Sequence, residues 1–231
     1  MERNWLQVLW KKEWHISENM QARKLKNHVQ QVLPFWIASL LVGLIAVAYT
    51  KLFSYAEDLL QTSLARHSWL IFIMAPICFL LAWLMVRILA PGARGSGIPQ
   101  VMAALELATP RHYSKVKGLL SLRVIITKIG SSLFMVLGGG AIGREGPTIQ
   151  IAGSVFTFVN KIIPASWPKL GRQSFILTGA AAGLAAAFNT PLGGIVFAIE
   201  ELARTHVRHF RTALFTAVII AGLTAQGFLG P

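Results

Sequence analysis

Three clusters rich in glycine and proline interrupt apolar stretches of the sequence, and two of them combine the residue types that bind anions. The clusters are Gly95-Ser96-Gly97-Ile98-Pro99, Gly143-Arg144-Glu145-Gly146-Pro147 and Asn189-Thr190-Pro191-Leu192-Gly193-Gly194. In the first two, proline stands where the opening turn of a helix would lie, and it loses no helical hydrogen bond there. We therefore predict two helix N-termini whose unpaired amides attract an anion.

One helix N-terminus alone is too weak to hold an anion that has lost its water. Its dipole contributes about 0.3–1 kcal/mol, or up to about 2 kcal/mol in a partly buried site. A hydrogen bond to a charged group contributes about 1.5–3 kcal/mol, whereas dehydration effectively costs several kcal/mol. Several termini converging on one point could hold the anion, and the sequence supplies two, with the Ser96 hydroxyl as a further neutral donor.

Glu145 stands at the start of the second predicted helix, inside an apolar stretch. A carboxylate within the membrane indicates a functional site by default. In the functional interpretation, the Glu145 carboxylate competes with a mobile anion for the same amides, and protonation releases it. The structural alternative is a helix-capping carboxylate or an ion pair with the adjacent Arg144.

Two further acids, Glu200 and Glu201, end the segment LGGIVFAIEE. They precede the basic cluster Arg204, His206, Arg208, His209 and Arg211. A solvated helix end with surface ion pairs explains these acids as well as a functional role does, so the residues alone leave both interpretations open.

The composition places these clusters in a membrane protein. Of the 231 residues, 54% are hydrophobic and only 13% are charged, whereas about a quarter of a soluble domain is charged. Disordered, collagen-like and disulfide-rich classes are excluded, because apolar content is high, no Gly-X-Y period occurs and Cys78 is the single cysteine. Apolar runs at 34–51 and 69–86 approach the length that spans a bilayer.

Later apolar runs, such as 175–188 and 192–199, are too short to cross alone. Broken helices of this kind occur within a membrane where their backbone is buried in protein or lines a cavity. In transporters, such half-helices direct their free amides toward the transported ion. The pattern therefore predicts an all-α, multi-pass transport protein.

The net charge of +13 fits a membrane protein better than a nucleic-acid-binding one. The basic residues gather between apolar runs, as the positive-inside rule expects, and no aromatic-basic stripe suits base stacking. We assign residues 1–33 to a cytoplasmic basic segment that could form an interfacial helix, and residues 34–231 to the membrane domain. We expect no nucleic-acid partner.

Other motif matches carry no chemistry. Gly138, Gly140 and Gly143 satisfy GxGxxG, but no strand-helix-strand unit surrounds them. The histidines show no metal spacing, and no Ser/His/Asp set can be drawn, so we expect no enzymatic activity, no cofactor and no metal. Gly179 and Gly183 form a GxxxG that predicts close helix packing.

The clusters resemble those of the CLC family of chloride channels and chloride/proton exchangers. The likeness rests on GSGIP at 95–99, GREGP at 143–147 and GAAAGLAAAFNTPLGGIVFAIEE at 179–201, and it covers about residue 30 to the end. It implies a membrane fold of tilted and broken helices like the first of the family's two inverted repeats.

The resemblance also implies roles for individual residues. Ser96 is similar to the serine that binds the central chloride, and serine there favours chloride over nitrate. Glu145 is similar to the gating glutamate that carries the proton, and Glu201, with Glu200 beside it, to the inner glutamate of the proton route. Lys128 matches a lysine near the inner part of the pathway. The chloride-binding set is then Gly95, Ser96, Gly97, Ile98, Pro99, Gly143, Arg144, Gly146 and Pro147.

The sequence also departs from the family's pattern. The GxFxP-type helix start and the late tyrosine of the second half have no counterpart, and Gln100 stands where an acid often follows GSGIP. The resemblance therefore implies the N-terminal half of a transporter that, when complete, exchanges chloride for protons as a homodimer in a bilayer. A bacterial inner membrane with a cytoplasmic N-terminus is the expected location. The alternatives are a passive chloride channel, and a truncated fragment or half-subunit that needs a separate second half.

Overall fold

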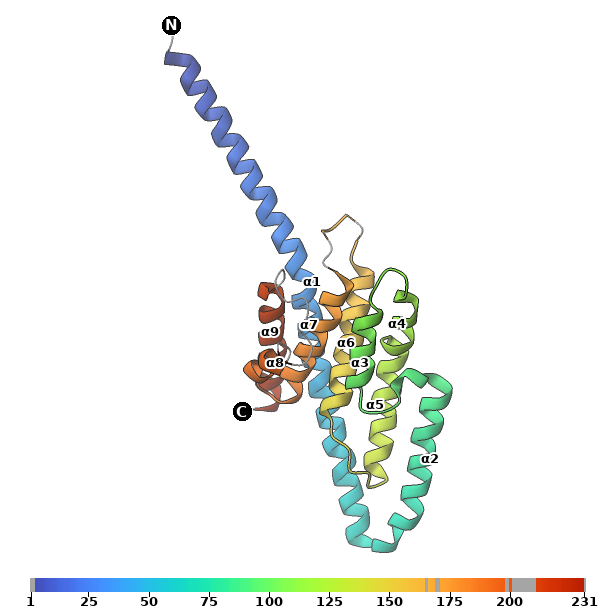
Figure 1. The fold of residues 1–231 in the computed structure, drawn as a ribbon. Coiled ribbons are helices and arrows are strands. Elements are labelled where there is room, and N and C mark those ends of the chain that lie inside the picture. Colours follow the sequence, from blue (N-terminus) through green and yellow to red (C-terminus); the bar gives the residue numbers. More distant parts are fainter. Residues whose placement is uncertain (1–2, 165, 169–170, 198–199, 201–210, 231) are drawn as a thin grey trace.

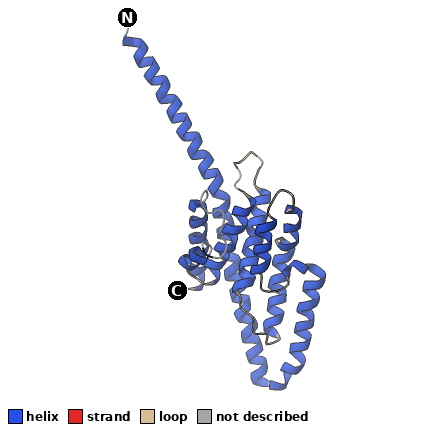
Figure 2. Cartoon of the chain, in the orientation of Figure 1, coloured by secondary structure: helices blue, strands red, loops and turns tan. Residues whose placement is uncertain are grey.

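The computed structural model describes residues 3–164, 166–168, 171–197, 200 and 211–230, and within these ranges it is helical and contains no strand. Figure 2 shows helices joined by short loops. In the part of the chain that the structure describes, four helical stretches are long and apolar enough to cross a membrane, namely Val29–Arg66, Ser68–Leu89, Tyr113–Leu137 and Thr212–Leu229. The prediction of an all-α, multi-pass membrane protein is confirmed.

Helix α1 (Arg3–Arg66) is a single element of 64 residues with Pro34 inside it. Its N-terminal part projects away from the other helices, and its later part runs along them (Figure 1). Phe35 anchors α1 in the core, because its ring lies 4.1 Å from the Phe175 ring and 6.0 Å from the Phe156 ring, centroid to centroid. The helix runs without a break through the boundary that we predicted between residues 33 and 34, and the assignment of the two segments to cytoplasm and membrane stays a prediction.

Two adjacent helices, α6 (Glu145–Ile162) and α7 (Arg172–Ala187), form the centre of the protein, and most of their residues are buried. They approach closely because α7 presents glycine at the contact. A Cβ atom on Gly179 would lie 2.8 Å from the Phe156 Cβ, and one on Gly183 would lie 2.9 Å from the Thr148 carbonyl oxygen. The predicted role of this GxxxG in close packing is confirmed.

Helices α2 (Ile71–Leu89) and α5 (Leu122–Leu137) pack against each other beside this centre. The turn η1 (Ser68–Leu70) leads from α1 into α2 (Figure 1). Of the α2 side chains, only Ala82 is buried, although the helix is strongly apolar. Such a surface suits lipid or a protein partner rather than water.

The remaining helices are short or begin at a break in the chain. The turn η2 (Pro91–Ala93) leads to α3 (Ile98–Leu107), and α4 (Tyr113–Leu119) precedes α5. Helix α8 (Pro191–Phe197) follows α7 after a break at which Asn189 has a φ of 57°. Helix α9 (Arg211–Leu229) packs on α1 and α7. The prediction of broken helices is confirmed.

Candidate functional site

The first glycine-proline cluster forms the start of α3, as predicted. Gly95 and Gly97 have φ values of 74° and 119°, which side-chain-bearing residues rarely adopt, and Pro99 lies in the first turn. The backbone N–H groups of Ser96, Gly97 and Ile98 have no acceptor among the described residues. This helix start therefore presents unpaired amides.

The second cluster forms the start of α6, and Glu145 is the first helical residue. Thr148 closes the first turn, because its N–H and its hydroxyl both donate to the Arg144 carbonyl oxygen, at 3.0 and 2.7 Å. Within the described ranges, no acceptor pairs with the N–H groups of Glu145 and Gly146. This start too leaves free donors at a positive helix end.

The two helix starts touch each other. A Cβ atom on Gly146 would lie 2.7 Å from the Ser96 carbonyl oxygen and 3.2 Å from the Ser96 Cβ. A Cβ atom on Gly97 would overlap the Gly146 carbonyl oxygen and lie 3.0 Å from the Gln150 Cβ. Only glycine allows this approach, so the sequence brings both sets of free amides into one region.

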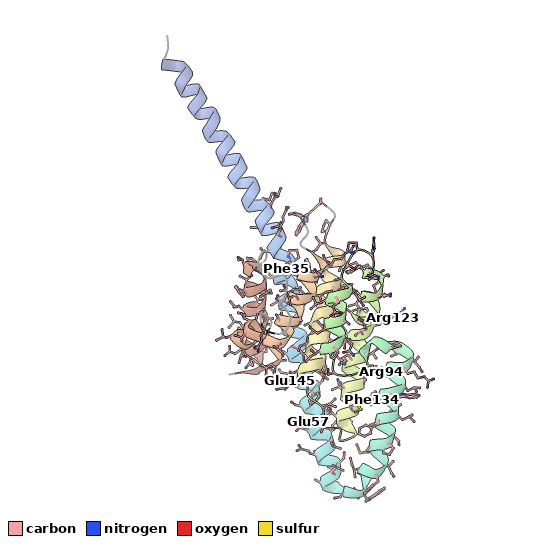
Figure 3. The ribbon with its side chains drawn as sticks, in the orientation of Figure 1. Phe35, Glu57, Arg94, Arg123, Phe134 and Glu145 are labelled. Atoms are coloured by element: carbon pink, nitrogen blue, oxygen red, sulfur yellow. The ribbon has the colours of Figure 1, made fainter. Side chains whose placement is uncertain are left out.

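A cavity of about 940 Å³ lies where they meet. Its wall includes residues from both helix starts, from α5 and from the inner side of α2. The lining residues that carry polar chemistry are Arg87, Arg94, Ser96, Lys128, Ser131, Ser132 and Glu145. Figure 3 shows Glu145 and Arg94 at a similar height in the middle of the molecule. Gly95, Ile98, Gly143, Gly146 and Pro147 also line the cavity, whereas Gly97, Pro99 and Arg144 are not part of its wall.

The charges around the cavity are mostly positive. Arg87, Arg94 and Lys128 line it, and Glu145 is the single acid among the described residues of its wall. Lys128 is buried, and its ammonium donates to the Ala93 carbonyl oxygen at 3.0 Å and to the Gly95 carbonyl oxygen. No carboxylate of the described residues neutralises it, so the cavity wall carries a buried positive charge.

The half-buried Glu145 carboxylate folds back over the preceding loop, because a Cβ atom on Gly143 would overlap its Oε2. It forms no ion pair with Arg144 and caps no described amide. The structural alternatives raised for Glu145 therefore find no support at this position. The carboxylate borders the cavity next to the free N–H groups that an anion would use.

The predicted inner acids are described only in part. Glu200 is exposed, and its role stays a prediction. Glu201 and the basic residues 204–209 lie outside the described residues. No group of three or more histidine, cysteine or acidic side chains that could hold a metal occurs in the described part of the chain.

Sequence reasoning missed two features of this region. Gln150 lies fully buried in α6 and donates to the Gly92 and Leu119 carbonyl oxygens, at 2.8 and 3.0 Å. Tyr49 donates to the Ser132 hydroxyl at 2.9 Å and thereby ties α1 to the cavity wall. A polar Gln150 inside the apolar run TIQIAGS was the available signal, since a buried amide needs partners.

Comparison with known proteins agrees with this geometry. The family model described as voltage gated chloride channel matches residues 77–231. H(+)/Cl(-) exchange transporters ClcA of Salmonella arizonae and Salmonella newport are each 34% identical over 204 residues, covering 84% of this chain and 41% of the relative. The crystal structure of a slow cyanobacterial Cl-/H+ antiporter matches 87% of this chain and 47% of that one, with a TM-score of 0.72 and 25% identity.

These matches confirm the family resemblance and the fold that it implied, and they show that the chain spans less than half the length of the relatives. The family model includes both helix starts that border the cavity, and the relatives cover most of the chain. The chain therefore belongs to the voltage-gated chloride channel (CLC) family.

Proposed function

We propose that this chain forms one half of a chloride/proton exchange pathway in a membrane. The observation that supports this most directly is that the starts of α3 and α6 both border one cavity with unpaired amides. In this proposal, the unpaired N–H groups within 95–99 and 143–147 and the Ser96 hydroxyl bind chloride. A hydrogen bond to an ion contributes about 1.5–3 kcal/mol, so several converging donors offset a dehydration cost of several kcal/mol.

In this proposal, the charge of Lys128 attracts an anion into the cavity, but its ammonium does not bind the anion directly. Its ammonium is occupied by two backbone carbonyls, yet its charge has no described carboxylate partner. A buried charge is costly unless it is paired, so a chloride ion in the cavity would lower the free energy of both ions. Because neutral donors would bind the chloride ion and the Lys128 ammonium would not touch it, the chloride ion stays mobile.

Glu145 would couple the two ions by exclusion. Its carboxylate borders the cavity beside free amides, so the site would hold either an anion or the carboxylate. Protonation removes the negative charge and admits chloride, which links proton movement to chloride movement. Such coupling requires states that the two ions favour differently. Glu201, with Glu200 beside it, would pass protons on the inner side.

The complete pathway would need more donors than this chain supplies. The chain spans 41% of the ClcA relatives, whose printed name is exchange transporter. We propose that a second half provides the opposite wall, and that the complete protein is a homodimer in a bacterial inner membrane with its N-terminus in the cytoplasm.

Proteoliposomes test this proposal. The chain alone, reconstituted with a chloride gradient, should pass little chloride because its site is half built. Co-expression with the C-terminal half of the Salmonella arizonae ClcA should give chloride efflux with opposite proton movement. The C-terminal half alone is the matched control.

Robust efflux from the chain alone would contradict the half-site interpretation. Efflux from the assembly without proton movement would indicate a passive channel instead of an exchanger. Assembly in the membrane without any chloride movement would indicate a non-transporting fragment.

A further inference from the structure

Four successive backbone carbonyls before α3 each accept a hydrogen bond from a side chain. Gln150 donates to the Gly92 oxygen at 2.8 Å, and Lys128 donates to the Ala93 oxygen at 3.0 Å and to the Gly95 oxygen. Gln100 donates to the Arg94 oxygen between them. We call Gln100, Lys128 and Gln150 the carbonyl clasp. The three side chains come from three different helices, α3, α5 and α6.

We propose that Gln100 and Gln150 are positioning residues of the chloride site, which, with Lys128, orient the peptide planes before α3 so that free amides face the ion. This inference rests on the proposed chloride site. A trans peptide is planar, so its C=O and the following N–H point in opposite directions. Fixing the Arg94 and Gly95 oxygens therefore aims the N–H groups of Gly95 and Ser96, which have no described acceptor.

The clasp also compensates the partial negative charge of the carbonyl oxygens, which would repel chloride. A carbonyl oxygen is the negative end of a peptide dipole, and Ala93, Arg94 and Gly95 all line the cavity. An N–H or ammonium donor on each oxygen compensates that negative end. Without these donors, rotation of one peptide plane would replace an amide by a carbonyl at the cavity wall.

Each glutamine that holds a backbone carbonyl leaves its own side-chain oxygen without a hydrogen bond. The Oε1 atoms of Gln100 and Gln150 are buried and have no partner among the described residues. An unsatisfied buried acceptor costs about 1–3 kcal/mol. The amide orientation is nevertheless determined, because a backbone carbonyl only accepts and therefore requires the NH₂ group. The arrangement sacrifices one acceptor on each side chain to hold the backbone.

Gln150 additionally joins both helix starts of the site. It stands five residues after Glu145 in α6, and its Cβ lies against Gly97 at the start of α3. Its second hydrogen bond, 3.0 Å long, reaches the Leu119 oxygen at the end of α4. A displacement of the α6 start is thereby transmitted to the backbone before α3.

The test replaces each glutamine by methionine, which keeps the length and removes the amide. Gln173→Met is the matched control, because Gln173 donates one 3.2 Å bond to the Leu105 oxygen at the far end of α3. All variants are compared in the assembly of this chain with the ClcA C-terminal half. Gln100→Met serves as the milder variant, since Gln100 is half-buried whereas Gln150 is fully buried.

We expect Gln150→Met and Gln100→Met to raise the half-saturating chloride concentration about tenfold. This is the effect of losing one hydrogen bond between a misoriented backbone N–H and the chloride ion. The chloride-to-nitrate flux ratio should fall as well, whereas Gln173→Met keeps both values. A folding defect alone lowers the maximal rate and leaves the ratio unchanged. Unaltered half-saturation and ratio in both glutamine variants would overturn the proposal.

A second measurement remains decisive if the wild-type assembly carries no chloride. The amides of Ala93 and Arg94 are hydrogen-bonded to the Ala90 and Pro91 oxygens. Hydrogen exchange of the chain in lipid nanodiscs should show faster exchange at these amides in Gln100→Met and Gln150→Met than in Gln173→Met. Equal protection in all three variants would refute the clasp, whatever the fate of the transport proposal.

Discussion

The starts of α3 and α6 and the start of α8 arise from the same sequence signal but have different surroundings. All three begin within a cluster of glycine and proline that interrupts an apolar run. The starts of α3 and α6 meet at the cavity and leave backbone amides unpaired. No residue of the α8 start lines that cavity.

At α8, the glycines and the proline serve packing. Pro191 lies against α9, where a Cβ atom on Gly222 would approach its Cγ to 2.7 Å. A Cβ atom on Gly194 would lie 2.9 Å from the Ala181 carbonyl oxygen in α7. The Leu192 and Gly193 N–H groups have no described acceptor either, so α8 differs from α3 and α6 in lacking the cavity, not in lacking free donors.

The comparison teaches that glycine and proline mark where a helix begins but not what its amides do. Proline in the first turn with glycine nearby is compatible with a buried contact and with an ion site alike. The distinguishing features are a cavity in front of the amides and a removable carboxylate beside them. The following predictions separate the packing role from the ion-binding role.

Gly97→Ala should have the largest effect, because it affects both fold and site. The φ of 119° is strained for alanine, and the new methyl would overlap the Gly146 backbone. We expect a loss of stability above about 4 kcal/mol, or failure to fold, in thermal unfolding of the chain in detergent. Gly95→Ala is the control, because its φ of 74° is strained but only the Gln100 amide is near, at 3.2 Å. Equal stability of the two variants would contradict the close contact between the helix starts.

Glu145→Ala should abolish proton coupling in the assembled protein while chloride still moves. Removing the carboxylate leaves the amides of α6 permanently available to an anion. The measurement is simultaneous recording of chloride and proton flux from proteoliposomes. Glu145→Gln, which keeps the size and loses the charge, should behave in the same way. Unchanged coupling in Glu145→Ala would remove Glu145 from the proposed role.

These helix starts were predictable from the sequence, but their meeting was not. Proline and glycine act locally, so GSGIP and GREGP predict where α3 and α6 begin without reference to the rest of the chain. The contact between Ser96 and Gly146 joins residues far apart in the sequence, and a one-dimensional pattern does not specify it. The family resemblance supplied that expectation.

The carbonyl clasp and the extent of α1 escaped prediction for two physical reasons. Gln150 bonds to oxygens 58 and 31 residues away, and backbone acceptors carry no sequence signature. The polar composition of residues 1–33 suggested a separate segment, yet one helix continues through the change of polarity and through Pro34. Composition reports the environment of a helix, whereas continuity depends on backbone hydrogen bonds.

Gly194→Ala should lower stability and leave ion selectivity unchanged. Its Cβ would lie 2.6 Å from the Ala185 Cβ, and overpacking of this kind costs about 1–3 kcal/mol. Gly227→Ala is the matched control, because no atom of the described residues lies within 4 Å of a Cβ at that position in α9. The checks are thermal unfolding and the chloride-to-nitrate flux ratio of the assembly. A changed ratio in Gly194→Ala would assign the α8 start to the ion pathway after all.

Ser96→Ala should show the reverse pattern, with normal stability and weaker chloride selectivity. Ser96 is exposed and lines the cavity, and no described hydrogen bond uses its hydroxyl, so alanine costs the fold little. Loss of one donor to a charged ion should weaken chloride binding about tenfold, the low end for such bonds because the site is open to solvent. Thr157→Ala removes a hydroxyl that donates only within α6, at 2.8 Å to the Gly153 oxygen, and should leave selectivity unchanged. If Ser96→Ala instead unfolded the chain and kept its selectivity, the α3 start would resemble the α8 start, and the distinction between the two kinds of helix start would fail.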